Sequence, residues 1–271
     1  MAGLGYRREM SDWDMSDVKA DFFEVIAENW IRRDPAPLLQ LIDAGRAVHL
    51  HGVSLNLGGS SPINAEFVQQ VGVLQQTLGT PFYSDHLAAS GDAHQLYDLF
   101  PIPFFAREVV RIGDRIREVQ DILGRRMAIE NPTWYTNIGD MPEAEFLAAV
   151  ADYADCNILL DLNNIDVNYK NHQQQTVDGY LTQIDFSRVN YLHVAGHEYD
   201  PRFDLYVDTH SRAAEPYIRD KALELQKKYG LPILLEWDND VPDIQMINQE
   251  LLWLTSGYAT APTHSQESLA C

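Results

Sequence analysis

Short apolar runs alternate with longer stretches of helical periodicity along the first 256 residues. The apolar runs predict strands over 3–6, 22–29, 47–55, 82–87, 126–131, 157–164, 189–197 and 232–240. The clearest helical pattern is 105–123, where apolar residues recur every three or four positions and Gly124 follows. The other helices are predicted near 14–20, from Pro35 to about 44, over 67–78, from Pro142, near 177–184, over 216–229 and over 244–254, with irregular chain from 198 to 215.

This order of elements predicts one α/β domain over residues 1–256. Repeated strand–helix units are typical of a parallel sheet, and eight of them favour closure into a (β/α)8 barrel of the TIM type. A chain of 271 residues fits the roughly 250 that such a barrel needs. An open doubly wound sheet is the alternative, but no glycine-rich phosphate loop follows the first predicted strand. The stretch 257–271 is rich in Ala, Ser and Thr and is predicted to be a disordered tail.

Side chains that can bind metals stand at or just after the ends of six consecutive predicted strands. The carboxyl ends of the strands in a parallel barrel all face one mouth, so these side chains should converge there. The candidate ligands are His51, His86, Glu130, Asp161, Asn164, His193, Asp208, His210 and Glu236. An octahedral ion accepts about six ligands, so this set predicts two or three ions that share a bridging carboxylate. The imidazoles disfavour magnesium and calcium and leave iron, manganese, zinc and cobalt open.

Further polar residues near the predicted mouth are candidates for binding substrate or supporting the ligands. They are Glu28, Asn131, His172, His197 and Arg7. Each also has a structural explanation, such as a buried ion pair for Glu28 or a surface ion pair for Arg7. His49, two residues before His51, is expected to face the surrounding helices.

Composition limits the classes of function. A net charge of −20 disfavours nucleic acid and anionic membranes as partners. No apolar run reaches the roughly 18 residues of a membrane span, and Met1–Met10 lacks the apolar centre of a signal peptide, so a cytoplasmic location is expected. The two cysteines, Cys156 and Cys271, form no Cys-x-x-Cys motif, which argues against a zinc ribbon.

An ordered set of motifs resembles one known family. The motifs are GLGYRRE (3–9), HGVSLNLG (51–58), SDHLA (84–88), IENP (129–132), LLDLNN (159–164), HVAGH (193–197), DTH (208–210) and EWDND (236–240). Each is weak alone, but their order over residues 3 to 240 is specific. They resemble the multinuclear non-heme iron-dependent oxidative enzymes.

The resemblance implies a triosephosphate-isomerase-type barrel holding two or three irons, mixed ferrous and ferric, on the same nine ligands. It implies oxygen-dependent modification of a cysteine in a ribosomally made precursor peptide, with a partner protein that holds the leader of the peptide. The start GLGYRRE is closer to the family member that excises a cysteine β-carbon in 3-thiaglutamate biosynthesis. Oxazolone and thioamide formation, as in methanobactin biosynthesis, is the alternative within the family.

Other classes of function also fit a metal-bearing mouth. A divalent-metal sugar isomerase or epimerase uses similar ligands. A metal-dependent phosphodiesterase or nuclease does too, but the acidic charge and the lack of a basic stripe count against it. A metal that only stabilises the fold is a third alternative, although structural sites usually need only four ligands.

Overall fold

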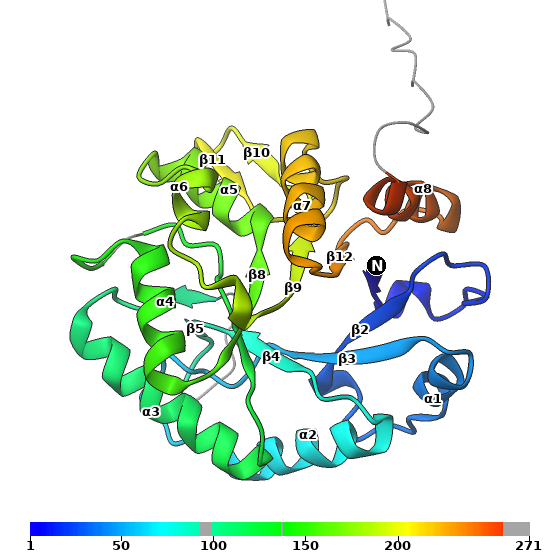
Figure 1. Ribbon diagram of the computed structural model, residues 1–271, viewed down its shortest axis with the longest axis horizontal. Coiled ribbons are helices and arrows are strands. Elements are labelled where there is room, and N and C mark those ends of the chain that lie inside the picture. The colour runs from blue at the N-terminus through cyan, green and yellow to red at the C-terminus, as the bar shows by residue number, and fades with distance from the viewer. Residues whose placement is uncertain (93–98, 137, 257–271) are drawn as a thin grey trace, which may run out of the picture.

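A closed barrel of eight parallel strands forms the centre of the molecule in the computed structural model, which describes residues 1–92, 99–136 and 138–256 (Figure 1). Its strands are β1 (Ala2–Gly5), β2 (Phe22–Ile26), β3 (Ala47–Gly52), β4 (Tyr83–His86), β7 (Ala128–Glu130), β8 (Asn157–Asp161), β9 (Val189–Val194) and β12 (Ile233–Leu235). They pair in chain order, and β1 closes the barrel by pairing with β12. The predicted (β/α)8 barrel is confirmed.

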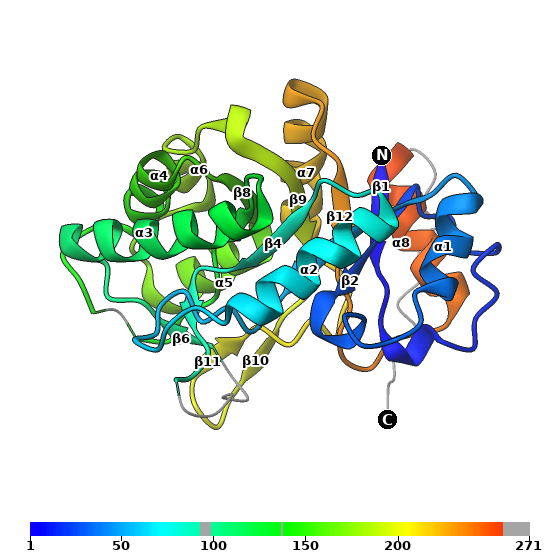
Figure 2. The same ribbon diagram turned by 90° about the horizontal axis from the view of Figure 1, so that it is seen from below.

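Helices surround the barrel, as two views at right angles show (Figures 1 and 2). They are α1 (Ala36–Asp43), α2 (Ala65–Leu78), α3 (Ala106–Leu123), α4 (Glu143–Ala154), α5 (Leu162–His172), α6 (Val177–Leu181), α7 (Pro216–Tyr229) and α8 (Ile244–Ser256). Within the described residues, no helix is both long enough and apolar enough to cross a membrane. The predicted disordered tail, 257–271, lies outside the described residues.

The helix predicted near 14–20 is wrong. Between β1 and β2 the chain forms a short 3-10 turn, η1 (Arg8–Met10), and then a series of turns. The carboxylate of Asp14 accepts hydrogen bonds from the backbone N–H of Ser16 at 2.9 Å and from its hydroxyl at 2.7 Å. Such local side-chain bonds offer the backbone a partner that competes with helix formation.

The predicted end of strand 157–164 is also wrong. Strand β8 stops at Asp161, and α5 begins at the next residue. Asp161 caps this helix, because its side chain accepts a 2.7 Å hydrogen bond from the backbone N–H of Asn164. The motif LLDLNN is therefore a strand followed by the first turn of a helix, which carries Asn164 to the mouth.

Two small hairpins extend beyond the barrel strands. Strands β10 (Glu198–Asp200) and β11 (Leu205–Val207) pair in the stretch predicted to be irregular. Strands β5 (Ala88–Ala89) and β6 (Phe100–Pro101) pair after β4. Both hairpins follow the carboxyl ends of barrel strands, so they lie on the side of the mouth.

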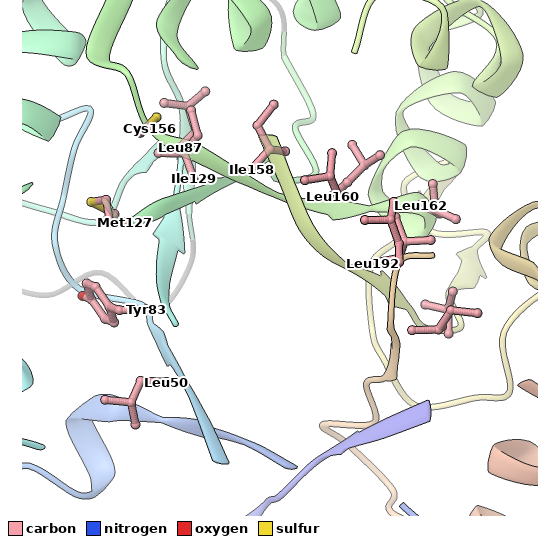
Figure 3. Close-up of a cluster of buried hydrophobic side chains, with 14 of the residues drawn as sticks. Leu50, Tyr83, Leu87, Met127, Ile129, Cys156, Ile158, Leu160, Leu162 and Leu192 are labelled. Atoms are coloured by element: carbon pink, nitrogen blue, oxygen red, sulfur yellow. The ribbon is translucent and has the colours of Figure 1, made fainter. Parts of the chain in front are cut away.

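The main hydrophobic core lies between the barrel and its helices. Barrel residues such as Ile129, Leu160 and Leu192 belong to one buried cluster with helix residues such as Val150 and Ile218, and Figure 3 shows the barrel part of it. These positions alternate along the strands with residues that face the barrel interior. The core thus fixes which side chains point inward.

Candidate metal centre

The inward-facing residues of five barrel strands form two layers. The lower one, here called the apolar floor, is a separate buried cluster of Phe22, Ala128, Leu159, Tyr191 and Leu234. Two residues further along each strand stand Glu24, Glu130, Asp161, His193 and Glu236. Residues two apart in a strand point to the same side, so every floor residue has a charged or imidazole side chain above it. We call this upper layer, with the groups described below, the polar cluster.

His49 faces the apolar floor and not the surrounding helices, so its prediction is wrong. It stands two residues before His51 and therefore shares its inward direction. Its ring lies 4.7 Å from that of Phe22 and 5.1 Å from that of Tyr191, centre to centre. Burial among these rings lowers the pKa of His49 to about 4, which keeps the imidazole neutral.

The polar cluster contains three overlapping groups with the spacing of metal ligands. In each group the ligand atoms lie within 4.8 Å of one another. The groups are His51, His86 and Glu130; Glu130, Asp161, His193 and Glu236; and His210, Glu236 and Asp238. Glu130 joins the first group to the second, and Glu236 joins the second to the third.

Glu130 uses a different oxygen toward each of its two groups. Its Oε2 lies 3.3 Å from Nε2 of His51 and 3.6 Å from Nε2 of His86. Its Oε1 lies 3.7 Å from Nδ1 of His193. This arrangement suits a carboxylate that bridges two neighbouring cations.

His193 is the centre of the second group. Its Nδ1 lies 3.0 Å from Oε2 of Glu236 and 3.8 Å from Oδ2 of Asp161. On the opposite side of the ring, Nε2 lies 2.9 Å from Oε2 of Glu24. The His193 ring therefore has the carboxylate of Glu24 at Nε2 and the other ligands of the second group at Nδ1.

The third group includes Asp238, which the sequence analysis missed. Nδ1 of His210 lies 3.1 Å from Oδ2 of Asp238 and 3.5 Å from Oε2 of Glu236. Arg7 joins the two carboxylates from behind, with a 2.7 Å bond from Nη2 to Oε1 of Glu236 and a bond from Nε to Asp238. The other oxygen of each carboxylate stays turned toward His210.

Asp208 and Asn164 lie beside the third group. Oδ1 of Asp208 is 2.7 Å from Nε2 of His210. The hydroxyl of Thr133 bridges the two residues, at 2.8 Å from Oδ1 of Asn164 and 3.0 Å from Oδ2 of Asp208. His210 thus has carboxylates at both ring nitrogens. Metal ligation by Asn164 and Asp208 stays a prediction, as it does for the other seven predicted ligands.

The charges of the cluster shift its protonation strongly. Burial lowers the pKa of His193, but the carboxylates of Glu24 and Glu236 outweigh burial and raise it well above the ordinary value. Burial likewise lowers the pKa of His210, and Asp208 and Glu236 raise it further than that. Without bound cations, protons on these two imidazoles must compensate the negative charge of the carboxylates around them. Because a ligating imidazole has to be neutral at the bonding nitrogen, a bound cation would replace such protons.

The acids of the cluster respond to the same neighbours. Burial, followed by the charge of Glu130, raises the pKa of Asp161 well above the ordinary value. Burial also raises the pKa of Glu24, but His193 reverses this and lowers it to about 2. Carboxylates at such close range favour a positive charge between them.

Several buried atoms of the cluster have no hydrogen-bond partner among the described residues. They are Oε2 of Glu130, Oδ2 of Asp161, Nδ1 of His193 and Nε2 of His210. A buried polar atom without a partner costs about 1–3 kcal/mol, so a folded protein rarely leaves several together. Cations would satisfy them, and the mixture of imidazole and carboxylate suits iron, manganese, cobalt or zinc. The residues therefore fit a centre of more than one ion.

Three of the five predicted supporting residues hydrogen-bond directly to groups at the mouth. Asn131 uses its side chain on the backbone of Asp161, accepting from N at 3.0 Å and donating to O at 2.9 Å. Arg7 forms its ion pairs inside the cluster rather than at the surface. Glu28 accepts from the backbone N–H of Val53 at 2.9 Å and from the hydroxyl of Ser54. All three order the mouth.

His197 supports Asp208 through an amide. Its Nδ1 lies 2.7 Å from Oδ1 of Asn163, and Nδ2 of Asn163 donates to Oδ1 of Asp208 at 2.6 Å. Nζ of Lys170 is 2.8 Å from the other ring nitrogen of His197. A donor on this side fixes the imidazole proton on Nδ1, so the amide can only present its N–H to Asp208.

His172 lies outside this network. It stacks on Trp134 with ring centres 3.9 Å apart, and its Nε2 is 2.8 Å from the carbonyl oxygen of Trp134. Its contacts order the chain after β7, and no contact with the three groups is present among the described residues.

Two members of the cluster were missed from the sequence, Glu24 and Asp238. Glu24 follows Phe22 of the apolar floor by two residues, and Asp238 follows the predicted ligand Glu236 by two residues. Applying the two-residue period within 22–29 would have selected Glu24 as well as Glu28. Asp238 lies past the end of β12, where the period no longer applies.

One side of the cluster is open to solvent. The side chains of Asp161 and His193 are 0% exposed, whereas those of His86 and Asp238 are 17% and 34% exposed. The second group is therefore the buried centre, and the first and third groups each include a side chain that solvent reaches.

Residues 1–256 match the family described as "RiPP precursor modification enzyme MbnB/TglH/ChrH", where RiPP denotes a ribosomally made and later modified peptide. The chain belongs to this family. The resemblance based on the ordered motifs is thereby confirmed. As a family member, the protein is an enzyme of the class that modifies RiPP precursors.

Relatives from bacteria carry only a family designation. A "UPF0276 protein" of Shewanella loihica is 40% identical over 97% of this chain and 96% of its own. Another, of Acinetobacter baylyi, is 39% identical over 92% of this chain and 88% of its own. This similarity extends along nearly the entire barrel.

Solved structures with the same architecture include sugar epimerases. The 3-keto-D-glucoside 4-epimerase YcjR of E. coli superposes with a TM-score of 0.62 at 11% identity, over 94% of this chain and 98% of its own. D-psicose 3-epimerase of Clostridium cellulolyticum H10 gives 0.64 at 12% identity, over 94% of this chain and 96% of its own. At such low identity the likeness shows the shared barrel fold alone.

Proposed function

We propose that this RiPP-modifying enzyme is a multinuclear iron oxidase that uses dioxygen to modify a cysteine of its precursor peptide. The reaction proposed is excision of the cysteine β-carbon, as in 3-thiaglutamate formation, and oxazolone or thioamide formation is the alternative within the family. The observation that carries the proposal is the chain of three ligand groups joined by Glu130 and Glu236. A single-ion enzyme has no need of two shared carboxylates.

We propose iron as the metal because of the types of ligand present and because of the family to which the chain belongs. Imidazoles together with carboxylates are the ligands of non-heme iron sites that activate oxygen. When bound, the ions would supply Lewis acidity and redox chemistry at fixed spacing. Glu130 would hold two of them, Glu236 would join the third group, and Arg7 keeps the bridging oxygen of Glu236 in place.

The open side of the cluster supports a peptide as the substrate. His86 and Asp238 are partly exposed at opposite ends of the three groups, while His193 and Asp161 between them are closed off. A cysteine side chain reaching in from the mouth can therefore approach without unfolding any barrel strand. A partner protein that binds the leader would bring the peptide to this mouth.

The decisive experiment is metal analysis of protein purified without oxygen, combined with iron spectroscopy and a peptide assay. Two or three irons per chain are expected, together with an oxygen-dependent mass change of a cysteine-ending precursor peptide. A single zinc per chain, or turnover that does not need oxygen, would overturn the proposal. Turnover of a ketose with manganese or cobalt under anaerobic conditions would favour the isomerase alternative.

A further inference from the structure

A cavity of about 330 Å³ lies beside the polar cluster, between the chain that follows β7 and the helices α4, α5 and α6. These helices pack on one side of the barrel (Figures 1 and 2). Trp134 lines the cavity, whereas the residue before it, Thr133, hydrogen-bonds Asn164 and Asp208 beside the third ligand group. Consecutive residues thus contact the two sites, so the cavity is a close neighbour of the candidate metal centre.

The partly buried carboxyl of Glu143 lines this cavity as an acceptor. Its Oε2 accepts from Nε1 of Trp134 at 2.7 Å and from Nδ2 of Asn168 at 3.0 Å. Its Oε1 accepts from the hydroxyl of Tyr180 at 3.2 Å and, among the described residues, from no other donor. A carboxylate oxygen can accept about two hydrogen bonds, so Oε1 has room for a donor from a ligand.

The donors around Glu143 are held by further contacts. Oδ1 of Asn168 accepts from the backbone N–H of Trp134 at 2.9 Å, and Nδ2 of Asn168 also lies 3.2 Å from the carbonyl oxygen of Pro132. The indole of Trp134 stacks on the ring of His172. The carboxyl is therefore held in one orientation before any ligand binds, which reduces the entropy lost on binding.

A second acceptor lines the same cavity. Oε1 of Gln175 is buried and has no hydrogen-bond partner among the described residues. A buried polar atom without a partner is unfavourable, so a donor from a ligand would stabilise it. Within the described residues, no lysine, arginine or histidine lines the cavity, and the other charged group there is the carboxylate of Asp140. The cavity thus offers acceptors and negative charge to a ligand that has donors and positive charge.

Apolar side chains form much of the remaining wall. Ile165, Met141 and Pro142 line the cavity and can cover an alkyl stem. Lysine and arginine combine such a stem with charged N–H donors at its end. A volume of about 330 Å³ is at the lower end of the range for ligand pockets, so the cavity suits one side chain rather than an extended peptide segment.

The protonation of Glu143 also favours a cationic ligand. Burial raises the pKa of Glu143 to about 7, although Trp134, Tyr180 and Asn168 donate hydrogen bonds to it. A positive charge at hydrogen-bond distance favours the ionised form of a carboxyl group. A bound cation would therefore supply the stabilisation that the three neutral donors do not.

We propose that this cavity binds the basic side chain, lysine or arginine, of a residue near the reacting cysteine in the precursor peptide. Its N–H groups would donate to Oε1 of Glu143 and to Oε1 of Gln175, and its stem would lie along Ile165. Holding a neighbouring residue beside the cluster would limit which cysteine reaches the metal ligands. The proposal rests on the proposed function in one respect, namely that a cysteine reacts at the cluster.

The first test uses the two basic groups alone. Acetyl-arginine amide and acetyl-lysine amide are titrated at pH 8 under nitrogen into protein with nitrogen-15-labelled tryptophan. The indole N–H signal of Trp134 reports binding, because this N–H donates to Glu143. Acetyl-citrulline amide keeps the shape of arginine without its charge. We expect the signal to shift with at least one basic amide and not with the citrulline compound.

Variants show which atoms bind the cation. Glu143→Gln should weaken binding of the basic amide by about 10-fold or more, because a charge-assisted hydrogen bond becomes a neutral one. Gln175→Leu should also weaken it, and this variant provides the test if Glu143→Gln does not fold. Glu145→Gln is the matched control, since Glu145 is exposed on the same helix, and it should bind as the wild type does.

The second test asks whether the cation belongs to a peptide. Cysteine-ending alanine peptides with a single arginine or lysine at successive positions before the cysteine are compared, by calorimetry under nitrogen, with citrulline versions. We expect one placement to bind the wild type about 10-fold more tightly than its citrulline version does, and to lose this gain in Glu143→Gln.

Three results would overturn the proposal. The first is no shift with either basic amide, and the second is equal binding by the wild type and the variants of Glu143 and Gln175. The third is binding of a basic amide without a gain at any peptide position, which would indicate a site for a free cation. None of these measurements involves turnover, so an absence of oxygen-dependent cysteine modification would contradict the proposed function without affecting this result.

Discussion

The apolar floor and the polar cluster are formed by the same five strands, two residues apart, yet they have opposite chemistry. Phe22, Leu159 and Leu234 below are fully buried and need no partner other than one another. Glu24, Asp161 and Glu236 above are also buried, but they need positive charge. The floor closes the lower end of the barrel to water and so makes the charge above it costly. Packing in the lower layer thus creates the demand for cations in the upper one.

Removing the carboxylate shared by two groups should have the largest effect on the cluster. Glu130→Ala leaves the first and second groups without their common ligand. We expect metal affinity and peptide turnover to fall by more than about 100-fold, beyond the range of supporting residues. Metal content by mass spectrometry and turnover measure this.

The control for that variant is Glu145→Ala, which removes an exposed glutamate on α4. Full metal content in Glu130→Ala would show that the first and second groups bind metal independently and would contradict a single joined cluster.

Opening a hole in the floor should affect stability rather than metal binding. Leu234→Ala removes a side chain that is 0% exposed, and we expect the free energy of unfolding to fall by about 2–5 kcal/mol. Urea denaturation of the metal-free protein measures it, and exposed Val73→Ala is the control. If the folded fraction of Leu234→Ala has lost its metal, packing of the floor also holds the metal ligands in place, and the two layers do not act separately.

The floor imidazole should make the protein sensitive to acid. The pKa of His49 is about 4 in the folded protein, against an ordinary value of 6.5. The unfolded chain therefore binds this proton first, so the contribution of His49 to stability is complete above pH 6.5 and falls as the pH drops toward 4. The loss at pH 5 is about 2 kcal/mol.

His49→Leu should remove this dependence. Thermal or urea unfolding of the metal-free proteins at pH 5 and pH 8 compares the two. We expect the variant to lose less stability than the wild type between pH 8 and pH 5. Identical pH profiles would place the imidazole in contact with water and not in the floor.

The partly buried carboxyl of Glu143, outside both layers, offers the smallest test. Burial raises the pKa of Glu143 to about 7, even though Trp134, Tyr180 and Asn168 donate hydrogen bonds to it. Hydrogen bonds from neutral donors thus do not stabilise the ionised carboxylate as a positive charge would. Since the folded pKa is raised above 4.5, ionisation weakens folding as the pH rises from 4.5 to 7.

Glu143→Gln should therefore be more stable than the wild type above pH 7, by about 1–2 kcal/mol, and similar to it near pH 4.5. The amide oxygen can take the two N–H donors while its N–H₂ group donates to Tyr180. Chemical denaturation at both pH values measures the difference. A variant less stable at pH 8 would show that the ionised form is the favoured one.

Much of the site could be predicted because it depends on local pattern. Residues two apart share a face of a strand, and parallel strands end at the same mouth. These two rules brought His51, His86, Glu130, Asp161, His193 and Glu236 into one cluster. The same rule, misapplied at His49, gave the wrong direction for that side chain. The helix of LLDLNN was missed because the cap formed by Asp161 resembles the end of a strand.

The barrel and the side chains that stand at its mouth can be read from local sequence alone, since both follow from periodicity within single strands. The grouping of those side chains depends instead on contacts between distant strands. Pairing register sets Asp161 beside His193 and His51 beside Ser84. Barrel closure brings Arg7 to Glu236 and Glu24 to His193, which are separated by more than 160 residues. Such contacts depend on how whole strands stagger around the ring, and no local stretch of sequence contains that information.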